Sequence, residues 1–191
     1  MGEIFIPNII ISRSGTEQSL TPLSYELCNR NIYLFGEINN ICAMNFLSQI
    51  HVLEDISSDP INLYINSPGG SVSDGFAIID AIEASPCIIT TNCTGLAASM
   101  AAVILASGEP GERRIGKFSE VMIHQPIGGV QGQASEISRV CDHIIKIREK
   151  LARHLSKCTG KKVEDLLLDM DRDFWMSANE AILYGLVDQI A

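Results

Sequence analysis

Short apolar runs and amphipathic segments alternate along most of the chain. Compact, β-branched runs bounded by turn residues predict strands, at residues 31–35, 61–66, 87–91 and 120–124. Apolar residues that recur every three or four positions predict helices between them, at residues 40–54, 71–85 and 97–107. Strands and helices that alternate in this way build parallel sheets covered by helices, so the pattern predicts an α/β fold.

A much longer amphipathic segment covers residues 131–157. Its apolar residues alternate steps of three and four and form a narrow stripe, made by Ile137, Val140, Ile144, Ile147 and Leu151. At 1.5 Å per residue such a helix is roughly 40 Å long, which exceeds what a domain of this size needs. We expect its far end to protrude and to bury the stripe against another subunit. The alternative is a long surface helix packed on its own core.

The two ends of the chain carry weaker patterns. Residues 1–30 are expected to be irregular apart from a short strand at 9–11, and they carry no recognisable chemistry. A shorter helix is expected at 163–170, followed by a closing segment. The predicted organisation is an N-terminal segment, 1–30, and a single domain over 31–191.

Composition and charge narrow the choice of partners. Of the 191 residues, 46% are hydrophobic and only 19% are charged, which suggests buried contacts between subunits. The net charge of −9 argues against binding to nucleic acid. The six cysteines show neither CxxC pairs nor metal-ligand spacing, which favours a reducing cytoplasm. No signal peptide or membrane-spanning run is read, so we expect a cytoplasmic protein without a membrane or metal site.

Ser99 is the candidate nucleophile, because small residues surround it and leave room for another polypeptide. A serine hydroxyl attacks only when a base takes its proton and the oxyanion is stabilised. The spacing differs from the G-x-S-x-G elbow, since Ala97 and Ala101 occupy the glycine positions. A serine packed within a helix is the alternative.

His124 and Asp173 are the candidate base and orienting acid. His124 ends an apolar strand, where a base is held rigidly but stays accessible. Asp173 precedes two aromatic residues, so we expect it to be partly buried and hydrogen-bonded. The alternatives are a histidine satisfied at a strand edge, and an acid that caps a helix or pairs with Arg172.

A glycine turn at 69–70 offers backbone donors. In the functional interpretation, the N–H groups of Gly70 and Met100 converge on the oxyanion, since glycine lets the backbone approach the substrate. An ordinary turn is the alternative.

Several motifs together resemble the ClpP family, the proteolytic subunit of the Clp protease. They are INSPGG (65–70), GLAASM (95–100), VMIHQP (121–126), QGQA (131–134), DRDFWMSA (171–178) and EAILYGLVD (180–188). The resemblance covers about residues 31–190. It implies a crotonase-like α/β spiral of β-β-α units, with Ser99, His124 and Asp173 as a triad and Gly70 and Met100 as oxyanion donors.

The resemblance also implies an assembly. Residues from about 131 to 158 would be the handle helix that joins two stacked heptameric rings, Arg172 would contact the opposite ring, and residues 1–30 would lie near the axial pore. An AAA+ unfoldase, ClpX- or ClpA/ClpC-like, would use ATP to feed unfolded polypeptides inside. The subunit itself would need no cofactor.

Two departures from the family pattern favour alternatives. Residues 12–20 fit it poorly, and Asp74 stands where the family carries a small neutral residue. Asp74 suits a helix N-terminus, and we expect it to face away from the cleft. A specialised or inactive subunit of a mixed ring is therefore one alternative. An acyl-CoA hydratase or isomerase of the crotonase type is another.

Overall fold

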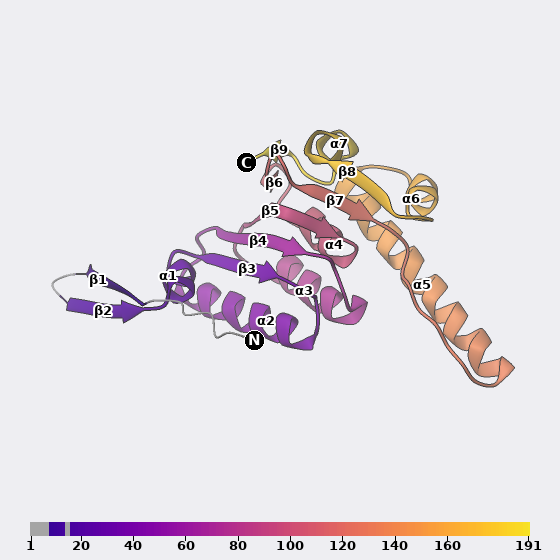
Figure 1. Cartoon of the computed structure of the whole chain (residues 1–191), viewed down its shortest axis with the longest axis horizontal. Coiled ribbons are helices and arrows are strands. Elements are labelled where there is room, and N and C mark those ends of the chain that lie inside the picture. The colour runs from indigo at the N-terminus through magenta and orange to yellow at the C-terminus, as the bar shows by residue number, and fades with distance from the viewer. Residues whose placement is uncertain (1–7, 14–15) are drawn as a thin grey trace.

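The structure, a computed structural model, describes residues 8–13 and 16–191 and is organised around a mostly parallel seven-stranded sheet (Figure 1). Five strands follow one another in parallel: β3 (Asn31–Phe35), β4 (Ile61–Ser67), β5 (Ile89–Ala98), β6 (Arg113–Ile115) and β9 (Gln189–Ile190). β7 (Glu120–Ile123) pairs in parallel with the end of β5, and β8 (Phe174–Ser177) pairs antiparallel with β7. The predicted α/β fold with parallel pairing is confirmed.

Strand β5 is twice as long as the sequence predicts. Its first half pairs with β6 and its second half with β7, so one strand continues through the polar residues Asn92 and Thr94. The Ser119 hydroxyl accepts a hydrogen bond from Gly95 N–H at 2.7 Å, which replaces a ladder contact where the strand changes partner. The extension carries the chain directly to Ser99.

Helices cover the sheet and enclose the core. α2 (Asn40–Ile56), α3 (Val72–Ala84) and α4 (Met100–Ala106) lie along one face of the sheet in Figure 1. All seven residues of α4 are buried, which explains its run of small and apolar side chains. α6 (Val163–Asp169) and α7 (Ala178–Tyr184) lie beside β8.

Helix α5 (Ala134–Thr159) extends away from the rest of the chain (Figure 1). Its C-terminal part is anchored, since Leu151, Ala152 and Leu155 are buried. Its N-terminal part exposes apolar side chains, with Ile137 37% and Ile145 53% exposed. The segment that leads into the helix runs back along it, and Gly128 lies against Ile144.

The N-terminal part is more regular than predicted. β1 (Ile9–Arg13) pairs antiparallel with β2 (Thr16–Leu20), and α1 (Pro22–Cys28) follows. The Thr21 hydroxyl accepts a hydrogen bond from Ser24 N–H at 3.1 Å and caps α1, a signal that the sequence contained. The strand expected at 9–11 is confirmed by β1, whereas the expectation that the remaining described residues up to 30 are irregular was wrong. Residues 1–7 and 14–15 lie outside the described residues.

Candidate active site

Ser99 lies in the sharp turn between β5 and α4. Its backbone has φ 56° and ψ −123°, a conformation that few residues other than glycine adopt. Ser99 N–H donates to the Met122 carbonyl on β7 at 2.8 Å, which holds the turn against the sheet. The predicted helix 97–107 therefore begins too early, because Ala97 and Ala98 pair with β7 as strand residues. A serine packed within a helix is excluded.

The glycine turn after β4 packs directly against Ser99. A Cβ atom added to Gly69 would lie 2.6 Å from Ser99 Cβ and 2.7 Å from the Ala98 carbonyl oxygen, and φ of Gly69 is +92°. Both observations require glycine at this position. Sequence reasoning treated Gly69 only as part of the turn, since no local signal distinguishes it from Gly70.

Two backbone donors beside this turn are unused. Among residues 8–13 and 16–191, neither Gly70 N–H nor Met100 N–H has a hydrogen-bond acceptor. Met100 is the first residue of α4, and its nitrogen would lie 3.0 Å from a Cβ atom added to Gly69. The glycine turn and the start of α4 are thus adjacent at Ser99, where free N–H groups can stabilise developing negative charge.

His124 joins Ser99 to Asp173. Its Nε2 lies 2.8 Å from Ser99 Oγ, and its Nδ1 lies 3.1 Å from Asp173 Oδ1. The register explains the meeting: Ile123 of β7 stands opposite Phe174 of β8, so the residues that flank this pair face each other. A base that contacts both a hydroxyl and a carboxylate has the geometry of nucleophile activation.

The burial of the three side chains differs from expectation at one position. The His124 side chain is 15% exposed, but that of Asp173 is 60% exposed. Asp173 was expected to be partly buried and hydrogen-bonded because two aromatic residues follow it; the hydrogen bond, to His124, is present, but the expected burial was wrong. Phe174 and Trp175 are themselves 37% and 52% exposed in the single chain, so they do not shield the carboxylate.

A small apolar cavity of about 20 Å³ opens beside Ser99 and His124. Residues of α3, α4, α5 and the loop after α6 complete its wall: Val72, Met100, Val103, Ile123, Pro126, Leu151, Leu155 and Met170. Asp74 does not line it. Burial raises the pKa of the Cys42 thiol on α2, and the negative charge of Asp74 raises it further.

Other candidate chemistry lies away from Ser99. His51 and His143 are exposed, and His154 contacts Ser107 at 2.8 Å on the far side of α4. No cluster of three metal-ligating side chains occurs among the residues that the structure describes. Over the same residues, no helix combines the length and apolarity that crossing a bilayer requires.

Comparison with known families decides the class of protein. A family model described as Clp protease matches residues 14–191, nearly the whole chain. The chain belongs to the Clp protease family. The match includes Ser99, His124 and Asp173, and it begins earlier than the resemblance seen in the motifs.

Membership of the Clp protease family indicates that the chain is a peptidase. It disfavours the acyl-CoA hydratase alternative, which needs carboxylates as acid and base and has no use for a nucleophilic serine.

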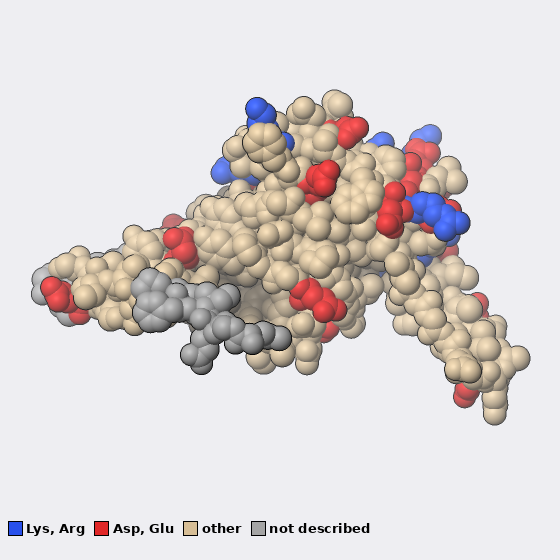
Figure 2. Space-filling model, in the orientation of Figure 1, with Lys and Arg blue, Asp and Glu red and all other residues tan. Residues whose placement is uncertain are grey.

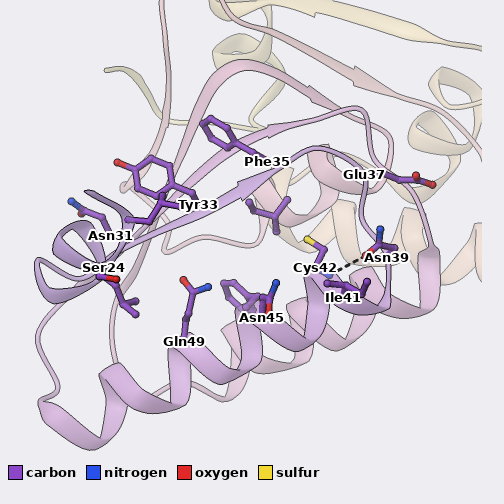
Figure 3. Close-up of a pocket in the computed structure, with 14 residues that line it drawn as sticks. Ser24, Asn31, Tyr33, Phe35, Glu37, Asn39, Ile41, Cys42, Asn45 and Gln49 are labelled. Atoms are coloured by element: carbon purple, nitrogen blue, oxygen red, sulfur yellow. Dashed lines mark hydrogen bonds between the residues drawn. The ribbon is translucent and has the colours of Figure 1, made fainter. Parts of the chain in front are cut away.

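A larger groove, of about 890 Å³, has none of Ser99, His124 and Asp173 among its lining residues (Figure 3). β3 contributes Tyr33 and Phe35, α2 contributes Ile41 and Phe46, and α1 contributes Leu23. Its lining is mostly apolar, and β3 is an edge strand, since it pairs only with β4 among the described strands. An apolar groove beside an open sheet edge is typical of a surface that another chain covers.

Proposed function

We propose that this chain is a serine endopeptidase that cuts unfolded polypeptides inside a closed ring assembly. The observation that carries the proposal is the hydrogen-bonded series of Ser99, His124 and Asp173 at 2.8 and 3.1 Å, in a chain of the Clp protease family. Ser99 is the nucleophile, His124 the general base and Asp173 the orienting acid.

The proposed reaction proceeds in two halves. As Ser99 Oγ attacks the carbonyl carbon of the peptide bond, His124 Nε2 accepts its proton, and Asp173 stabilises the imidazolium through Nδ1–H. The N–H groups of Gly70 and Met100 donate to the oxyanion. The C–N bond then breaks as His124 protonates the leaving amine. Water cleaves the resulting ester by the same steps, which releases the acid and restores Ser99.

Two exposed features support the assembly that we propose. The protruding end of α5 carries Ile137 of the predicted apolar stripe, 37% exposed, which a facing handle helix in a second heptameric ring would bury. The Arg172 side chain is 94% exposed and makes only a long contact, 3.8 Å, with its neighbour Asp171, so its guanidinium is accessible to an opposite ring. In addition, Figure 2 shows few charged side chains over the middle of the visible face, which is compatible with contact between neighbouring subunits.

The remaining parts of the proposal follow from the family. An AAA+ unfoldase would supply unfolded chains at the expense of ATP, residues 1–30 would lie near the axial pore, and residues 31–191 would form the peptidase domain. This subunit would need no cofactor, and the assembly would act in the cytoplasm.

The test replaces Ser99 with alanine. Hydrolysis of a fluorogenic peptide is expected to fall by about a thousandfold or more, and labelling by a fluorophosphonate probe to disappear. Ser107→Ala is the matched control, because Ser107 also contacts a histidine but lies at the C-terminal end of α4, whereas Ser99 lies at its N-terminal end. Continued labelling of the Ser99→Ala variant would show that another residue is the nucleophile.

The exposure of Asp173 favours a second version of the function. A carboxylate that is 60% exposed in the single chain leaves room for a neighbouring subunit to cover it, and in a mixed ring that neighbour would be a paralogue. Activity that appears only after a second family member is added would support this version.

A further inference from the structure

The structure assigns a positioning role to Gln125, which holds the loop that carries Asp173, with Arg148 of α5 as a second anchor of the same loop. This inference rests on the proposed function, because it concerns the residue that orients His124. Neither side chain contacts Ser99 or His124 in the described contacts, so both would act through Asp173.

Gln125 forms hydrogen bonds to the loop through both its backbone and its side chain. The loop spans residues 170–173, between the end of α6 and the start of β8. Gln125 N–H donates to the carbonyl of the fully buried Met170 at 2.6 Å. The side-chain Nε2 donates to the Asp171 carbonyl at 3.0 Å and to Asp171 Oδ1 at 3.3 Å. Since Gln125 directly follows His124, the base and the acid's loop are fixed to one another.

Arg148 approaches the same loop from the long helix. Its Nη2 donates to the Leu167 carbonyl in α6 at 2.8 Å and lies 3.9 Å from Asp171 Oδ1. Arg148 Nε is buried and has no hydrogen-bond partner among the described residues. The Asp171 carboxylate therefore faces both Gln125 and Arg148.

Asp173 needs such support because little else holds it. Its carboxylate is 60% exposed, and its one described side-chain partner is His124 at 3.1 Å. A carboxylate on a four-residue loop orients a base only if the loop itself is fixed, since small displacements of catalytic groups lower the rate strongly.

The test compares Gln125→Met, which keeps the length of the side chain but removes its donor, with the wild-type chain. We expect kcat for peptide hydrolysis to fall by about tenfold with little change in KM. Both constants are expressed per subunit that a fluorophosphonate probe labels to completion, so that an unfolded fraction does not contribute to the loss of kcat.

Gln125→Glu is the second variant. It is nearly isosteric, but it places a carboxylate against the acceptors of Asp171, so the loss of kcat should exceed that of Gln125→Met. Arg148→Met should lower kcat per labelled subunit in the same way, whereas Arg153→Met should not. Arg153 lies on the same helix, is 68% exposed and pairs only with Glu149 among the described residues.

A double-mutant cycle separates positioning from other effects. In an Asp173→Asn background, Gln125→Met should slow fluorophosphonate labelling by less than about twofold, because the group it positions is already disabled. A full tenfold loss in that background, or an unchanged kcat per labelled subunit in Gln125→Met, would overturn the inference. If the wild-type chain itself is not labelled at Ser99, the proposed function fails instead.

Discussion

At the scale of single residues, the turn around Ser99 depends on a neighbour that performs no chemistry. Gly69 fits because it lacks a side chain at a point where Ser99 and Ala98 approach within van der Waals contact. Ser99 itself keeps a strained backbone, which persists only when the surroundings determine it. The two residues therefore form one structural unit, although they lie on different strand–helix connections.

Gly69→Ala is expected to destabilise the chain by about 3 kcal/mol or more and to abolish peptide hydrolysis. The added methyl group meets backbone that cannot move aside, and the left-handed φ adds strain. Urea unfolding and a fluorogenic peptide assay measure the two effects.

Gly36→Ala is the control for backbone strain alone. Gly36 also has a positive φ, +82°, but nothing lies within 4 Å of an added Cβ. It should cost about 1–2 kcal/mol and leave peptide hydrolysis intact. Equal effects of the two substitutions would show that contact with Ser99 is unimportant.

The sequence predicted the identities of the site residues better than their environments. Ser99, His124 and Asp173 were nominated because separate motifs occur in one order, and the sheet register then brings them together. The exposure of Asp173 was missed, because the sequence does not show that the two aromatic residues after it leave its carboxylate uncovered. Gln125 gave no signal beyond its position next to His124.

At the scale of elements, α5 is joined to α3 and α4 by a buried histidine. His154 Nε2 lies 2.8 Å from the Ser107 hydroxyl at the end of α4, and Nδ1 lies 3.6 Å from Glu83 of α3. Burial lowers the pKa of His154 below 6.5, while Glu83 partly opposes that effect. The carboxylate of Asp80 also raises this pKa, whereas the positive charges of Lys150 and Lys157 on α5 lower it further.

The stability of the chain should therefore decrease on acidification. The unfolded chain takes up the proton near pH 6.5, whereas folded His154 resists it, so stability present above pH 6.5 is lost as the pH falls toward the folded pKa. Urea unfolding at several pH values between about 7.5 and 5 measures the loss.

His154→Gln should reduce the pH dependence, because an amide can still donate to Ser107 without titrating. His143→Gln, an exposed change on the same helix, should retain the wild-type dependence. An unchanged slope in His154→Gln would mean that other groups cause the acid sensitivity.

Elements with strong periodicity were predicted well, and those fixed by tertiary contacts were not. The long helix was predicted within a few residues, since its pattern extends over seven turns. The second half of β5 was missed because the β-branched run ends at Thr91 and residues 97–107 were predicted to be a helix. Contacts with Ser119 and β7 make this stretch a strand. α7 and the short strands β6, β8 and β9 carry too few residues for periodicity to reveal.

At the scale of the whole molecule, the protruding part of α5 has no apolar partner within the described chain that would explain its exposed isoleucines. Ile137→Glu would place a charge in the proposed contact between rings. We expect the mass in solution to fall to that of a single ring, as measured by sedimentation, and peptide hydrolysis to fall with it.

Leu183→Glu is the matched control, since Leu183 is 87% exposed on α7, away from α5. It should leave the mass unchanged. A full-sized assembly of the Ile137→Glu variant would show that α5 does not join the rings.

The open edge of β3 has a consequence for the handling of this protein. Unpaired strand edges beside apolar surface recruit any extended chain that they meet, including misfolded copies. Dilution, which normally protects a protein from precipitation, would here separate subunits and uncover that edge. Samples should consequently keep best when concentrated, and a cell that makes too few copies would lose them to deposits or to quality control.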